Sequence, residues 1–289
     1  MSTDRAAWPR SSTETLFTAL RIYGFALSVG LRAIGAGLFT EGLKLLVSPV
    51  GYWRFLPNAI VLEEFSKLSG NAQVLDASSP KLLSLLLASR TGGTVYATDL
   101  DDKKIFTRWH RLAVALGYEN YRVEYQDARQ LAYPDESFDL IYSISVIEHI
   151  PGCGDANALT EFRRLLKPGG RIVVEVPYRH QRTEKFAQYD SKGVQLESPQ
   201  FYERHYDAVW LRERLEVPGL GVTRKMILGE TLPLDPWIAS GRLPRPLRIL
   251  ILPFEPLLAA LNYWARPDDR RGRPLAALLV YEKTKLPES

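Results

Sequence analysis

The sequence contains a single cysteine, Cys153, among 289 residues. One thiol excludes an internal disulfide and a cysteine-rich zinc site, and it is typical of a protein in a reducing compartment. Long uncharged apolar runs are also missing, since Arg21, Arg32, Glu41 and Lys44 interrupt the most apolar N-terminal stretch. A helix that spans a bilayer needs about 18 or more such residues. We therefore expect no transmembrane helix.

Other absences narrow the class of protein further. The net charge is only +4, and no long run of lysine or arginine offers a track for nucleic-acid phosphates. The first residues carry Asp4, Arg5 and Arg10 without a small-residue cleavage site behind a compact apolar core, so no secretory signal peptide is expected. There are no internal repeats and no low-complexity segment. These features predict a cytoplasmic globular protein that binds no nucleic acid.

What is present is organised around residues 72–102, AQVLDASSPKLLSLLLASRTGGTVYATDLDD. Val74 and Leu75 predict a short buried strand that ends at Asp76. Ser79 is a good helix N-cap and Pro80 suits the first helical position, so a helix is expected over Lys81 to Ser89. Thr94 to Thr98 then reads as a second strand, followed by an acidic residue, Asp99. This order is half of a nucleotide-binding fold, in which such a carboxylate binds a ribose.

The alternation of strands and helices continues after Asp99. Helices are expected from Asp101 or Asp102 to Leu116 and over residues 155–166, and strands over the stretches 121–125, 138–143 and 171–176. Alternating strands and helices predict a parallel sheet with right-handed crossovers, whose ligands bind at the carboxyl ends of the strands. Asp76, Asp99, Asp127 and Ser143 all stand at such ends.

Three further motifs follow in a characteristic order: DARQLAYPDESFDLIY at 127–142, EHI at 148–150 and LLKPGGRIVVEVP at 165–177. With the strand pair before them, they make residues 73–177 resemble a class I S-adenosylmethionine-dependent methyltransferase of the small-molecule type. The resemblance implies a Rossmann-like, doubly wound α/β fold with a seven-stranded sheet whose last strand is antiparallel. Strands around Val222 and Leu278 agree with that implication.

The resemblance also implies a cofactor, S-adenosyl-L-methionine, and the residues that bind it. The turn after the first strand would hold the methionine part, Asp99 the ribose hydroxyls, and the ends of the third and fourth strands the adenine and the pocket near the methionine. These residues are Asp76, Ala77, Ser78, Ser79, Asp99, Leu100, Asp127, Ala128 and Ser143. The family's glycines in the first turn are replaced here by Ser78, Pro80 and Leu82, which should tighten that part of the site.

Methyl transfer is an in-line displacement that requires alignment of the acceptor and removal of its proton. His149 is the candidate base, since it follows the fourth strand and histidine changes charge near neutral pH; the alternative is a structural histidine. Tyr178 leaves the fifth strand directly and is the candidate for orienting the substrate. Glu148 reads as structural, and Ser145 stands where a metal-binding relative would have its first carboxylate, so no metal is expected.

Two apolar segments lie outside this core. Residues 16–47 form a helical lid or a helix lying in a membrane interface. Residues 249–264 lie within an insertion before the last strand, between arginines at 242, 245 and 248 and at 266, 270, 271 and 273; this insertion is a membrane anchor or a helical cap. The expected units are residues 1–70 (N-terminal helices), 71–228 (methyltransferase core), 229–274 (helical insertion) and 275–289 (last strand and tail).

The sequence as a whole therefore predicts methyl transfer to a lipophilic small molecule or lipid at the inner membrane face. Oxygen is expected as the acceptor atom, because no acidic cage for an amine is evident. A nicotinamide-dependent reductase is disfavoured, since neither a GxGxxG loop nor a Tyr-x-x-x-Lys pair is present. The remaining alternative is a methyltransferase-like scaffold that no longer catalyses, which the altered first turn would favour.

Overall fold

The computed structural model describes residues 11–100, 103–189, 194–238, 244, 247, 250–268 and 273–284. Its centre is an eight-stranded sheet in the order β3-β2-β1-β4-β5-β10-β8-β9. These strands are β1 (Val74–Ala77), β2 (Val95–Asp99), β3 (Tyr121–Tyr125), β4 (Phe138–Ile144), β5 (Leu166–Pro177), β8 (Leu220–Glu230), β9 (Tyr263–Arg266) and β10 (Arg273–Lys283). Strands β1 to β5 pair in parallel, and β10 lies antiparallel between β5 and β8.

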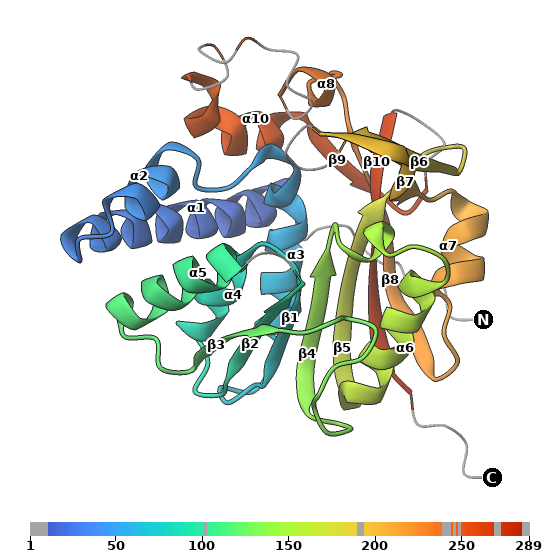
Figure 1. The fold of residues 1–289 in the computed structure, drawn as a ribbon, viewed down its shortest axis with the longest axis horizontal. Helices are drawn as coiled ribbons and strands as arrows, with labels where there is room; N and C mark the ends of the chain where they lie inside the picture. The colour runs from blue at the N-terminus through green and yellow to red at the C-terminus, as the bar shows by residue number, and fades with distance from the viewer. Residues whose placement is uncertain are drawn as a thin grey trace.

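Helices cover both faces of this sheet (Figure 1). The longer ones are α1 (Ser11–Gly35), α2 (Phe39–Val47), α3 (Phe55–Phe65), α4 (Lys81–Ala88), α5 (Lys103–Leu116), α6 (Gly154–Leu165), α7 (Ala208–Leu215) and α10 (Glu255–Asn262). Shorter turns of helix are η1 (Tyr52–Arg54), η2 (Ile147–His149), α8 (Asp235–Ile238) and η3 (Leu252–Phe254). The fold class predicted from the sequence is confirmed.

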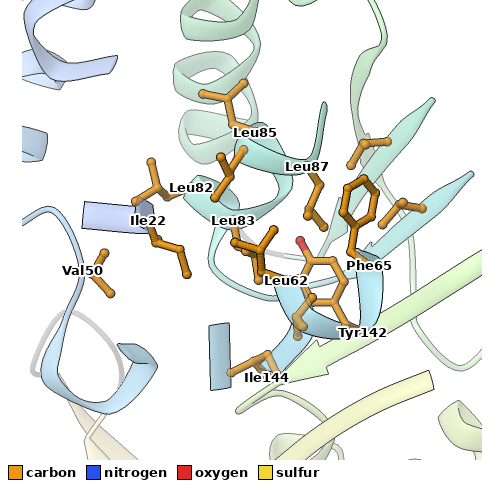
Figure 2. Packing of buried hydrophobic residues seen from close by; sticks show 14 of the residues in the cluster. Ile22, Val50, Leu62, Phe65, Leu82, Leu83, Leu85, Leu87, Tyr142 and Ile144 are labelled. Carbon is orange, nitrogen blue, oxygen red and sulfur yellow. The ribbon is translucent and has the colours of Figure 1, made fainter. Parts of the chain in front are cut away.

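Successive strand residues point to opposite faces, so the sheet separates two cores. Val74 packs with the cluster under α1, α3, α4 and α5, whereas its neighbour Leu75 packs with the cluster under α6 and α7. Figure 2 shows the first cluster, where Leu83 of α4 meets Tyr142 of β4 and Ile22 of α1. The N-terminal helices are therefore integral to one face of the core, and this packing positions the strand ends that form the site.

Three expectations about local structure are wrong. The sheet has an eighth strand, because β9 pairs antiparallel with the edge of β8, Trp264 opposite Gly229. Pro80 rather than Ser79 is the N-cap of α4, and the Ser79 hydroxyl instead accepts a hydrogen bond of 2.7 Å from the Ile144 amide. The sequence pattern predicts a helix over residues 60–68, after Pro57, but helix α3 begins earlier, at Phe55. Pro57 is tolerated in the first turn, because its missing N–H has no intrahelical partner there.

Residues 178–205, after β5, are a long polar and aromatic segment that the sequence pattern predicts to be a functional loop. Most of this segment folds into a hairpin. It consists of β6 (Thr183–Tyr189) and β7 (Gln195–His205). A buried carboxylate, Asp155 at the start of α6, holds the end of this hairpin through Arg204 Nη1 at 3.2 Å and the Tyr206 hydroxyl at 2.6 Å. Arg214 of α7 completes the network at 2.7 Å. Burial would raise the pKa of Asp155, but these bonds lower it below its ordinary value, so the hairpin is fixed by a buried anion.

The two apolar segments meet each other. Residues 16–47 fold into α1 and α2, broken after Gly35, and the Tyr23 hydroxyl of α1 donates to the Pro253 carbonyl of η3 at 3.4 Å. Large apolar side chains remain exposed on both, among them Phe39 and Leu43 on α2 and Phe254 and Leu257 on the insertion. Arginines 242, 245, 248, 270 and 271 lie outside the described residues.

A membrane-spanning helix was not expected, and within the described ranges no single helix is both long and apolar enough to cross a bilayer. Helix α2 and residues 52–65 reach the required length and apolarity only together, with a bend of 73° between them.

Candidate active site

The parallel strands end at one edge of the sheet, beneath α10 and the hairpin β6–β7 (Figure 1). This edge brings together the predicted cofactor residues at the ends of β1, β2, β3 and β4. The register places Asp76 opposite Ala97, and Ala77 opposite Thr98, next to Asp99. Residues far apart in sequence therefore meet because parallel strands share one carboxyl edge.

The turn after β1 is closed by a buried lysine. Lys81 Nζ donates to the carbonyls of Ser79 and Thr98 at 2.9 Å each. The same ammonium lies 3.5 Å from Asp76 Oδ1 and 3.6 Å from Asp99 Oδ2. It thus ties the first turn to the end of β2. No sequence pattern predicts this role, because a lysine in the first turn of a helix usually faces water.

Two neighbours of this lysine show how tightly the turn is packed. Asp76 is fully buried; burial raises its pKa, while Lys81 and the Ser79 amide oppose that rise. Ser78 has φ of +64°, a left-handed conformation that glycine adopts far more readily than serine. The backbone therefore keeps the bend that a glycine would favour, although the side chains are different.

The far side of this edge is more open. Leu100 is largely exposed, whereas Ala128 is buried. The Asp127 carboxylate receives three bonds from the Arg129 guanidinium, of 2.6 to 3.0 Å, and one from the Arg129 amide; the side-chain bonds chiefly lower its pKa. Ser143 is buried and donates to the Ala77 carbonyl at 3.3 Å, so it braces β1 against β4.

These residues fit the cofactor unevenly. Asp99, Leu100 and Ala128 offer the carboxylate and apolar contacts that an adenosine requires. At the turn after β1, where the resemblance places the methionine part, the Lys81 ammonium is bonded to the surrounding oxygen atoms. Asp99 would hold the ribose and residues 76–79 the methionine part; once bound, S-adenosylmethionine supplies an electrophilic methyl group on a sulfonium.

A cavity of about 610 Å³ lies next to this edge. Its lining comes from η1 and the residues before it, the exit of β4, the end of β5, the hairpin β6–β7, the insertion and the start of β10. Representative residues are Tyr52, Trp53, Ser145, Glu148, His149, Glu175, Tyr202, Leu252 and Glu255. It is large enough for a small-molecule acceptor. Tyr52 anchors its roof, because its amide donates to Glu255 Oε2 at 2.8 Å and its hydroxyl accepts from Asn262 at 2.6 Å.

The cavity also gathers acidic residues that the sequence analysis did not connect: Glu148, Glu175, Glu203, Asp235 and Glu255. Glu203 is bonded to Lys185 at 2.6 Å and to His205 at 2.9 Å; burial opposes ionisation, but these bonds lower the pKa of Glu203 to about 2. The sequence pattern shows no acidic cage for an amine, and it does not connect these five carboxylates, because they come from separate segments.

Glu148 and Glu175 are the most deeply buried of this group. Burial raises the pKa of Glu148 well above its ordinary value, and the nearby Glu175 charge adds to the rise. Burial likewise raises the pKa of Glu175, to about 7, although the Ser145 hydroxyl and the Arg54 charge oppose it. Two buried carboxylates whose charges repel each other do not both ionise readily.

The two predicted catalytic residues lie in different environments. His149 lines the cavity and is partly exposed; its Nδ1 lies 2.7 Å from the Tyr202 carbonyl, and its Nε2 lies 3.7 Å from Glu148 Oε1. Tyr178 is buried in the core under α6 and α7 and is not among the cavity-lining residues. Within the described part of the chain, no cluster of histidine, cysteine or carboxylate side chains could hold a metal ion.

Comparisons with known proteins agree with the fold. Residues 75–174 match the family model of a methyltransferase domain. The chain is 29% identical over 85 residues to 27-O-demethylrifamycin SV methyltransferase of Amycolatopsis mediterranei, covering 29% of this chain and 24% of that protein. It is 25% identical over 181 residues to phosphoethanolamine N-methyltransferase 2 of Caenorhabditis elegans, covering 61% of this chain and 37% of that one.

Both matches thus span less than two thirds of the relative's length. Among solved structures, geranyl diphosphate methyltransferase in complex with GPP and sinefungin superposes with a TM-score of 0.52 at 12% identity, over 78% of this chain and 77% of that one. At that identity the superposition establishes the shared fold alone. The recognised family and the fold predicted from the sequence are confirmed.

Proposed function

Since this chain carries a class I S-adenosylmethionine-dependent methyltransferase domain, we propose that it transfers a methyl group from that cofactor to a small molecule bound in the 610 Å³ cavity. The observation that carries the proposal is the position of the cavity. Ser145, at the exit of β4, lines it, while Ser143, two residues earlier, belongs to the cofactor edge. Donor and acceptor sites are therefore adjacent, as an in-line displacement requires.

We further propose an oxygen acceptor. A cationic amine would need negative charge that is not already paired. Glu203 is bonded to Lys185 and His205. Burial raises the pKa of both Glu148 and Glu175, so this pair is not fully ionised at neutral pH. A neutral hydroxyl can instead donate to one carboxylate and accept from a protonated one. The named relatives include both an O- and an N-methyltransferase, so a direct assay must choose between the two acceptor atoms.

The acceptor is proposed to be lipophilic and to enter from a membrane surface. The apolar side chains of α2 and of the insertion are exposed together, and Leu252 of the insertion also lines the cavity. We call α2 and the apolar part of the insertion, residues 39–47 and 249–264, the cover of the cavity. Amphipathic segments of this kind can lie in a bilayer interface without spanning it. We therefore place the protein at the inner membrane face, in contact with lipid through residues 16–47 and 249–264.

Formation of S-adenosylhomocysteine tests the transfer. The purified protein is incubated with S-adenosylmethionine and vesicles that contain either an alkylcatechol or an alkylamine of the same chain length. Product with the catechol supports an oxygen acceptor, whereas product with the amine alone contradicts it. No product with either probe, although the cofactor binds, would favour the scaffold that no longer catalyses.

Vesicle co-sedimentation tests the membrane contact. Phe39→Glu and Phe254→Glu together should weaken binding to anionic vesicles, because both side chains are exposed on the cover. Val114→Glu is the matched control, since Val114 is equally exposed but lies on α5. Equal binding of the wild type and both variants would contradict the proposed contact.

A further inference from the structure

The cavity contains a buried carboxylic acid pair that no motif predicted. Glu175 lies at the end of β5, where the register places it opposite Ile144 of β4, and Glu148 lies in the turn η2 that follows β4. Both line the cavity and both are at least nine-tenths buried. Glu148 Oε2 has no hydrogen-bond partner among the described residues. A buried polar atom without a partner, on a residue that lines a cavity, makes that carboxyl group a candidate to bond a ligand.

Building on the proposed methyl transfer, we propose that Glu175 accepts the proton of the acceptor hydroxyl, while protonated Glu148 donates a hydrogen bond to the same substrate. The acceptor class is thus a neutral hydroxyl compound that can donate one hydrogen bond and accept another.

Ser145 holds Glu175 in place for this role. Its hydroxyl donates to Glu175 Oε2 at 2.8 Å, and its amide donates to the Glu175 main-chain carbonyl at 3.1 Å. Ser145 has φ of +53°, a strained conformation for a serine, and such strain persists only where surrounding bonds enforce it. Glu175 also lines the cavity, and a carboxylate has room for more than one donor, so it is placed to accept a further hydrogen bond from a substrate.

The protonation states support this assignment. Burial raises the pKa of Glu175 to about 7, which is close to ideal for a general base at neutral pH. Burial and the nearby Glu175 charge raise the pKa of Glu148 well above its ordinary value, which favours the protonated form of Glu148. When their environments shift the pKa values of two carboxyl groups differently, one group can donate a hydrogen bond while the other accepts a proton.

His149 is less suited to take the proton first. Its Nδ1 lies 2.7 Å from the Tyr202 carbonyl, within hydrogen-bond distance, whereas its Nε2 lies 3.7 Å from Glu148 Oε1, beyond that distance. The ring is therefore held by the hairpin on one side and lies beside the acid pair on the other. We assign His149 a positioning role, in which its ring packs against Tyr202 and orders the turn that carries Glu148.

The chemical balance of the step is simple. The acceptor oxygen forms a bond to the methyl carbon, and the carbon–sulfur bond of the donor breaks with its electron pair remaining on sulfur. The hydroxyl proton moves to the Glu175 carboxylate and is then lost to solvent. The other charged and titratable groups that line the cavity are Arg54, Glu148, His149, Arg179, Lys185, Glu203, His205, Asp235 and Glu255.

The test combines a binding readout with an activity readout. Protein carrying carboxyl-¹³C glutamate is titrated by NMR with and without an alkylcatechol, and S-adenosylhomocysteine formation is followed against pH. We expect a carboxyl resonance with a midpoint near pH 7 that moves when the catechol binds and is missing in Glu175→Gln. We also expect this variant to lose about 100-fold or more in kcat, with little change in KM.

Two further variants separate the roles. His149→Gln should keep the pH dependence of the wild type, and Glu282→Gln, at the opposite end of the sheet, should keep its full activity. A pH dependence that vanishes in His149→Gln but persists in Glu175→Gln overturns the assignment, as does a Glu175 resonance that the bound catechol leaves unchanged. A shifted resonance without any S-adenosylhomocysteine formation contradicts the proposed methyl transfer instead.

Discussion

Replacing Glu175 by glutamine should make the protein more stable at alkaline pH, while it removes the proposed proton acceptor. In the folded protein burial raises the pKa of this carboxyl from 4.5 to about 7. Between these two values the folded state holds a proton that the unfolded state has lost. Stability therefore falls as pH rises through this window, and the full cost is present above pH 7.

The size of the effect follows from that shift. A difference of about 2.5 pKa units at about 1.36 kcal/mol each amounts to about 3 kcal/mol. Glutamine keeps the shape of the side chain and has no charge to bury. The free energy of unfolding of Glu175→Gln should therefore exceed that of the wild type by up to about 3 kcal/mol at pH 8, and the two should be nearly equal at pH 4.5.

Urea unfolding followed by circular dichroism at several pH values measures this difference. Glu282→Gln is the control, since the Glu282 side chain is substantially exposed and pairs with Arg171 at 3.5 Å. The stability of this variant should follow the wild type within about 0.5 kcal/mol. If the difference in the free energy of unfolding between Glu175→Gln and the wild type does not grow from pH 4.5 to pH 8, the pKa of Glu175 is not raised in the folded protein. Lost activity in a variant of increased stability would also exclude misfolding as the cause.

Three other substitutions test the supports of the site. Asp155→Asn leaves two buried arginine contacts without their anion and should lower the free energy of unfolding by about 3 kcal/mol in urea titrations; a loss below about 1 kcal/mol would contradict the network. Lys81→Met removes an ammonium that repels a sulfonium, so calorimetry should show S-adenosylmethionine gaining affinity relative to uncharged S-adenosylhomocysteine, and an unchanged ratio would count against that repulsion. Tyr52→Phe breaks the bonds to Asn262 and Glu230 and should cost about 1 to 3 kcal/mol in thermal unfolding, whereas an unchanged midpoint would deny them a role.

The central sheet could be predicted because its signals are local. Buried strands such as Val74–Ala77 and Val95–Asp99 are short apolar runs, each ending in an acidic residue or a tight turn, and the order of strands and helices fixes their direction. Asp99 and Asp127 could be assigned to the site for the same reason, since parallel strands share one carboxyl edge. Their roles toward the cofactor remain predictions.

The interior of the site could not be predicted because it depends on contacts between distant segments. Nothing near Lys81 indicates that its ammonium turns back to reach Asp99, 18 positions later. The acid pair joins residues 27 positions apart, and the strained Ser145 that holds Glu175 has no sequence signature. The hairpin β6–β7 was missed because most of its residues face solvent on both sides, so the alternation that marks a half-buried strand is weak.

The most direct test of the account is calorimetric titration of the intact chain with S-adenosylmethionine and with S-adenosylhomocysteine, alongside Asp99→Ala. We expect the wild type to bind both ligands. Asp99→Ala should remain folded by circular dichroism but lose most of that affinity, because the carboxylate that accepts hydrogen bonds from the ribose is gone. Binding of neither ligand by a folded wild-type protein, or equal binding by Asp99→Ala, would contradict the placement of the cofactor at this edge of the sheet.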